Sequence, residues 1–110
     1  MLIRSQNKAV LLNFSNLDAI YTVKDGDDFI ISSLKDGNKC TLGKYSTKAK
    51  AMKVLDMIQE SYADEKLVDY TTYLQRKEIE KMDDSTILAL RNELMKKAVF
   101  QIPDDSEVEV

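Results

Sequence analysis

Over the first 45 residues, apolar and polar positions alternate in short segments that turn-forming residues separate. Five strands are predicted, at residues 2–4, 10–13, 19–23, 29–34 and 40–42. The third and fourth are rich in the β-branched and aromatic residues that favour strands. Asp25-Gly26 and Asp36-Gly37 are typical of hairpin turns, and Asn7-Lys8 is a further candidate turn. Residues 1–45 are therefore predicted to form an antiparallel β-meander.

At Ser46 the apolar spacing changes to three and four residues, which predicts an amphipathic helix. The Ser46 hydroxyl is expected to cap a helix that opens at Thr47. A weaker helical period continues to Leu74, with Asp64-Glu65 as a possible restart. The stripe expected to pack on the sheet comprises Ala51, Val54, Leu55, Ile58 and Tyr62.

Asp83-Asp84-Ser85 is a second helix start signal, because acidic groups suit the positive end of the helix dipole. That helix is expected to end near Lys96-Lys97. Residues 99–102 alternate as a strand does and stop at Pro103, the only proline. For the acidic residues 104–110, a frayed tail and an edge strand both remain open.

The fold class expected from this pattern is α+β. An N-terminal antiparallel β-meander is followed by two or three α-helices and a short C-terminal strand. A chain of 110 residues with 44% apolar residues suits one domain. Its expected parts are a sheet in 1–45, a helical part in 46–98, and a strand with an acidic tail in 99–110.

Charge is distributed unevenly around the net value of −3. Residues 35–59 hold six lysines against Asp36 and Asp56, whereas residues 60–110 are acidic. A basic middle between acidic flanks does not suit binding of a nucleic-acid polymer, which needs a wider positive surface. It does allow a local anion site.

The residue types present exclude most catalytic machinery. The chain has no histidine, which removes the commonest general base and the commonest zinc ligand. Cys40 is the single cysteine and is expected to be a buried or half-buried core residue. The acidic pairs Asp27-Asp28, Asp83-Asp84 and Asp104-Asp105 sit at turns, helix starts or the tail, where local structure explains them. We expect no enzyme activity, no cofactor and no metal site.

Two places offer groups for an anionic ligand. Lysines surround the start of the Ser46 helix, whose free N–H groups attract anions; the alternative is a solvated lysine face. Arg91-Asn92 lies on the last predicted helix. The planar guanidinium of the arginine suits a phosphate, and the amide of the asparagine offers a donor and an acceptor to the edge of a base. Tyr73 has an aromatic face for a base, although aromatic residues at helical spacing are also typical of a core. The lysines are Lys44, Lys48, Lys50 and Lys53.

Two stretches of the sequence resemble a known group of proteins. One is Leu42-Gly43-Lys44-Tyr45-Ser46-Thr47 running into Lys50–Ile58. The other is Val99–Val108, together with Met1–Gln6 at the front. They resemble small proteins of Gram-positive bacteria and their phages, and within that group the first described anti-Thoeris sponges. Those sponges sequester the cyclic ADP-ribose signal of a host defence system.

This resemblance implies a phage-encoded protein that binds cyclic ADP-ribose, or a cyclic oligonucleotide, between protomers without degrading it. It also implies a homo-oligomer, as dimers or hexamers. The ligand-binding residues we expect are Arg91, Asn92, Arg4, Tyr73 and Gln101. Two alternatives stay open: a phage or prophage inhibitor that binds a host protein, and an enzyme that degrades such signals.

The expected location is the host bacterial cytoplasm. The first eight residues contain no long apolar stretch that would serve as a signal sequence. No segment approaches the roughly 18 continuous apolar residues of a membrane span. We therefore expect no membrane partner.

Overall fold

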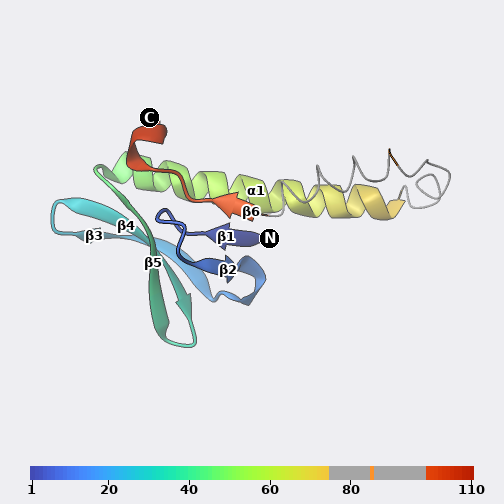
Figure 1. The fold of residues 1–110 in the computed structure, drawn as a ribbon, viewed down its shortest axis with the longest axis horizontal. Coiled ribbons are helices and arrows are strands. Elements are labelled where there is room, and N and C mark those ends of the chain that lie inside the picture. The colour runs from blue at the N-terminus through green and yellow to red at the C-terminus, as the bar shows by residue number, and fades with distance from the viewer. Residues whose placement is uncertain (75–84, 86–98) are drawn as a thin grey trace.

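The computed structural model describes residues 1–74, 85 and 99–110. Within these residues, six strands lie in two three-stranded sheets, and one long α-helix runs along them (Figure 1). The elements are β1 (Leu2–Arg4), β2 (Leu11–Asn13), β3 (Ala19–Asp25), β4 (Asp28–Lys35), β5 (Asn38–Tyr45), α1 (Lys48–Leu74) and β6 (Val99–Gln101). Two short 3-10 helices are η1 (Phe14–Asn16) and η2 (Asp105–Glu107).

Sheet B, in the order β3-β4-β5, is built from consecutive antiparallel strands. Asp36 and Gly37 both have positive φ, at 50° and 80°, as the two central residues of a type I′ hairpin turn require. Gly26 has φ 61° in the β3–β4 turn. Both predicted Asp-Gly hairpins are therefore confirmed, and their strands are longer than the sequence pattern predicted.

A β-bulge interrupts the regular pairing of β5 with β4. Ile31 pairs with Gly43 and Ser32 with Thr41, so Leu42 is an extra residue in the strand. Leu42 is 1% exposed. A Cβ atom at Gly43 would lie only 2.9 Å from Cγ2 of Ile102, so this position requires glycine for close packing.

Sheet A, in the order β2-β1-β6, joins the two ends of the described chain. β1 pairs antiparallel with β2 and parallel with β6. The prediction of one meander over residues 1–45 is therefore wrong, because β1 and β2 form their own sheet with β6. Pairing of β1 with a strand almost a hundred residues later leaves no local signal in the sequence.

The helix α1 begins one residue later than predicted. Thr47, not Ser46, caps it, since the Lys50 N–H donates to Thr47 Oγ1 at 3.2 Å. No glycine or proline interrupts residues 48–74, and the helix runs through Asp64-Glu65 without restarting. At 1.5 Å per residue its 27 residues span about 40 Å.

The expectation of two or three helices after one meander is wrong for the described residues. They hold one α-helix and six strands in two sheets, with more strand than helix. The α+β class itself agrees with the structure. The helix predicted after Asp83 lies outside the described residues, apart from Ser85.

The core lies between α1 and the sheets. The predicted helix stripe is confirmed: three of its members are buried, and Leu55 and Tyr62 are half-buried. Cys40 is half-buried, as predicted. The buried apolar residues are Ile3, Ile31, Leu42, Tyr45, Ala51, Val54, Ile58, Ile102 and Val108.

Candidate functional site

The acidic C-terminal segment folds back onto the start of α1. It forms η2, and Val108 is 5% exposed, so it is neither a frayed tail nor an edge strand. The Asp105 carboxylate accepts hydrogen bonds from the Ser46 N–H at 2.8 Å and from the Ser46 hydroxyl at 3.0 Å. Lys50 Nζ lies 3.3 Å from the same carboxylate. The chain thus supplies its own anion at this helix start.

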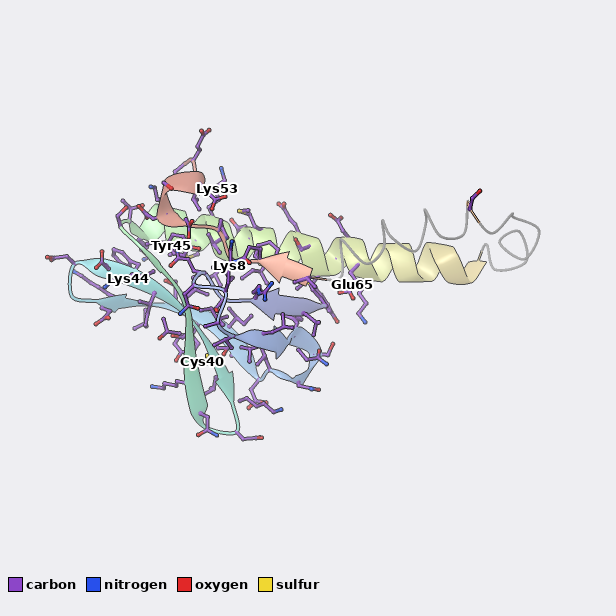
Figure 2. The ribbon with its side chains drawn as sticks, in the orientation of Figure 1. Lys8, Cys40, Lys44, Tyr45, Lys53 and Glu65 are labelled. Atoms are coloured by element: carbon purple, nitrogen blue, oxygen red, sulfur yellow. The ribbon has the colours of Figure 1, made fainter. Side chains whose placement is uncertain are left out.

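Three of the four lysines near the helix start, all but exposed Lys48, have partners among the described residues of the chain. The Lys53 ammonium donates to the main-chain carbonyl of Glu109, and Lys44 Nζ lies 3.3 Å from Asp28. Figure 2 labels both lysines. The hydrogen bond from the Ser46 N–H is the main cause that lowers the pKa of the Asp105 carboxyl below its ordinary value; Lys50 adds to the effect. These lysines therefore form neither a free anion site nor a wholly solvated face, the two interpretations that the sequence allowed.

A hydrogen bond from Tyr45 joins the C-terminal segment to sheet B. The Tyr45 hydroxyl donates to the Pro103 carbonyl at 2.6 Å, and the Gln6 Nε2 donates to the same oxygen at 3.0 Å. Gln6 also bonds to both main-chain groups of Lys44. Burial raises the pKa of the Tyr45 phenol, and the nearby acidic residues of the C-terminal segment raise it further. This phenol is therefore a structural donor.

Two predicted ligand residues meet on sheet A. Arg4 of β1 and Gln101 of β6 are direct partners in the parallel pair, so their side chains share one face. Both residues are exposed. Leu11, the partner of Arg4 in β2, is 53% exposed on that same face. A cation, an amide and an apolar side chain therefore stand side by side across three strands.

A tight turn connects β1 to β2 immediately after Arg4. Ser5 is 2% exposed, its hydroxyl accepts from the Val10 N–H at 3.0 Å, and it donates to Asn7 Oδ1 at 2.7 Å. The Ser5 carbonyl accepts from the Lys8 N–H and from Gln101 Nε2, both at 2.9 Å. The turn therefore joins the β1–β2 connection to the side chain of Gln101.

Lys8 is a residue that the sequence analysis did not select. It sits at the predicted Asn7-Lys8 turn with φ 65°, a left-handed conformation that lysine seldom adopts. Arg4 Nε donates to the main-chain carbonyl oxygen of Lys8 at 3.4 Å, so the backbone of one exposed cationic residue contacts the side chain of another (Lys8 is labelled in Figure 2). That contact uses Nε and, within the described residues, leaves both Nη groups of Arg4 without a hydrogen-bond partner. The Asn7-Lys8 turn signal was the clue to this residue.

The remaining predicted site residues are not brought to this face by the described structure. Tyr73 lies in α1, near its end at Leu74. Arg91 and Asn92 lie outside the described residues. The candidate site that the structure supports is therefore the outer face of sheet A, with Arg4, Lys8 and Gln101.

A second surface feature lies on α1. An open depression of about 450 Å³ is lined mainly by apolar side chains, and Met52 in it is 43% exposed. The depression is lined by Ala49, Met52, Lys53, Asp56, Met57, Glu60 and Val110.

Within residues 1–74, 85 and 99–110, no three metal-ligating side chains gather closely enough to hold an ion.

Fold and site together define a small two-sheet α+β domain with an exposed arginine–amide surface. No family model, no curated protein and no solved structure matches the chain in the comparisons made. In the described part of the chain, no helix combines the length and the apolar character that a membrane crossing requires.

Proposed function

We propose that this protein is a phage-encoded anti-defence sponge. It binds a small anionic nucleotide signal, a cyclic ADP-ribose or a cyclic oligonucleotide, and sequesters it without degrading it. The proposal rests on the resemblance of the two sequence stretches and on the pairing of Arg4 with Gln101. It includes a homo-oligomer that acts in the host bacterial cytoplasm.

The outer face of sheet A has the groups that such a ligand needs. The Nη groups of Arg4 suit a phosphate in a bidentate geometry, and exposed Lys8, whose main-chain carbonyl accepts from Arg4 Nε, contributes a second cationic residue. Gln101 extends the surface with an amide that its bonds to the Ser5 and Ile102 carbonyls hold in place. Leu11 provides an apolar surface for a base or a ribose. None of these groups is a general base near neutral pH, which suits binding without turnover.

Arg91, Asn92 and Tyr73 remain proposed members of the same site. A nucleotide has both a phosphate and a base, and Arg4 with Lys8 accounts for the phosphate alone. A base needs a stacking surface and a hydrogen-bonding edge, which tyrosine and asparagine supply. We include in the proposal that these three residues meet Arg4 across a junction between protomers.

Binding of cyclic ADP-ribose isomers, measured by titration calorimetry, tests the site. Arg4→Ala removes a charge-assisted pair worth about 1.5–3 kcal/mol, so we expect affinity to fall by roughly 10- to 150-fold. Gln101→Ala is expected to weaken binding less, and Lys48→Ala, an exposed lysine at the helix start, is the matched control. Equal affinity of the wild type and Arg4→Ala would show that the binding site does not lie on sheet A.

A host-protein inhibitor is the second candidate function, and the depression on α1 favours it. Exposed Met52 in a largely apolar hollow is a surface that a partner helix can fill. Capture of one stoichiometric host protein, lost in Met52→Lys and accompanied by no retained nucleotide, would support this function over the first.

A further inference from the structure

The two faces of sheet B have different surroundings. Side chains of β3 and β4 that face α1 reach the core, as Ile20, Phe29 and Ile31 do. The side chains between them point to the opposite face, because successive residues of a strand alternate. This opposite face is called the outer face of sheet B. By register it carries Ala19, Tyr21, Val23 and Asp25 of β3, Asp28, Ile30, Ser32 and Leu34 of β4, and Lys39, Thr41 and Lys44 of β5.

The outer face is unusually apolar for a sheet whose other face already packs on a core. Antiparallel sheets that are solvated on one side normally carry polar residues there. Here Val23 and Ile30 are direct cross-strand partners, and Val23 is 44% exposed. Among the described residues, Tyr21, Ile30 and Leu34 are half-buried without belonging to the residues that pack against the core.

Polar groups on the outer face are arranged asymmetrically across the strands. The β3 row is apolar and ends in the exposed carboxylate of Asp25. The β5 row has exposed Lys39, Thr41 and Lys44, and the Lys44 side chain is 60% exposed despite its contact with Asp28. One edge of the face is therefore apolar and acidic, and the other edge is basic.

We propose that the outer face of sheet B is the docking surface for a second copy of this chain. A two-fold axis along β4 places the β3 row of one copy over the β5 row of the other. Asp25 then meets the partner's Lys44, and the aliphatic stems of lysines cover Tyr21 and Val23. A self-complementary patch is what a two-fold interface requires.

One face of a three-stranded sheet forms a small contact area, so the association is expected to be weak and concentration-dependent. Interfaces below about 1,200 Å² of total buried surface belong to the transient class. The proposal names a surface for the homo-oligomer that the proposed function includes, but it concerns sheet B alone and is tested apart from nucleotide binding at sheet A.

Sedimentation velocity over a hundredfold concentration range tests the interface on the full chain. The wild type is expected to shift from monomer toward dimer as concentration rises. Val23→Lys is expected to weaken the dimer at least tenfold, while Met52→Lys, with 43% exposure at the start of α1, leaves it unchanged. Circular dichroism of each variant establishes that it is folded.

Charge reversal tests the arrangement of the two copies. Asp25→Lys and Lys44→Glu are each expected to weaken the dimer severalfold, and the double variant to recover most of the loss. A wild type that stays monomeric throughout, or a dimer that Val23→Lys leaves intact, would overturn the proposal. A dimer disrupted by Met52→Lys instead would assign self-association to α1, and a double variant no better than the single variants would reject the two-fold along β4.

Discussion

The two sheets of this protein differ in what holds them together. Sheet B consists of consecutive strands, and backbone ladders between neighbours in sequence account for it. Sheet A consists of three-residue strands from the two ends of the described chain. Hydrogen bonds from Gln6 and Tyr45 to Pro103, and from Ser46 to Asp105, hold the C-terminal segment that follows β6. The strand pairing of sheet A therefore joins distant parts of the sequence, whereas the strand pairing of sheet B joins neighbouring parts.

The largest expected effect comes from removing the apolar anchor of the C-terminal segment. Ile102 is 1% exposed and packs beside Gly43 of β5. Ile102→Ala is expected to lower the free energy of unfolding by about 2–5 kcal/mol, because it leaves a cavity in the shared core. Urea denaturation measures the loss. Val99→Ala, at a position 40% exposed in β6, is the matched control and should change the free energy by less than about 0.5 kcal/mol.

A smaller effect is expected from the Tyr45 hydroxyl. Tyr45→Phe removes its hydrogen bond to the Pro103 carbonyl and should cost about 1 kcal/mol, since Gln6 still donates to that oxygen. Hydrogen exchange should accelerate at the amides of Ile102 and Glu107 and stay unchanged in the β3–β4 hairpin. Adding Gln6→Ala should cost more than the two single changes combined, because the carbonyl then loses both donors. Equal acceleration in both sheets would contradict the separation between them.

The smallest effect is expected from pH and concerns Asp105. Its pKa is lower in the folded protein than the ordinary 3.8, so its contribution to stability is present above pH 3.8 and is lost as pH falls further. Acid titration followed by NMR should show the Ser46 amide and the C-terminal segment changing before β3 and β4. Asp105→Asn should remove this early step; an identical acid transition in the variant would contradict the role assigned to the carboxylate.

The difference between the sheets also explains what the sequence could predict. The Asp-Gly turns and the stripe around Val54 are local signals, and both predictions are confirmed. The pairing of β1 with β6 depends on contacts such as Gln6 with Pro103, which no local pattern reveals. Within the described residues the predicted helix count was wrong, because Asp64-Glu65 looks like a start signal but lies within an uninterrupted helix.

The candidate site was predictable in its residue types and not in its assembly. Arg4 and Gln101 were selected from their chemistry and the family resemblance, and the register of β1 with β6 places them side by side. Lys8 was missed because its left-handed conformation follows from the hydrogen bonds around Ser5. Arg91 and Asn92 remain predictions.

The most direct test of binding without chemistry is recovery of the ligand. Pure protein is mixed with excess cyclic ADP-ribose, freed of unbound ligand and denatured by heat, and the released material is measured by mass spectrometry. The expected result is that the wild type releases ligand of unchanged mass and retention time. Arg4→Ala is expected to release at least tenfold less ligand than the wild type. Release of a converted product, or no retained nucleotide from the wild type, would contradict the proposed function.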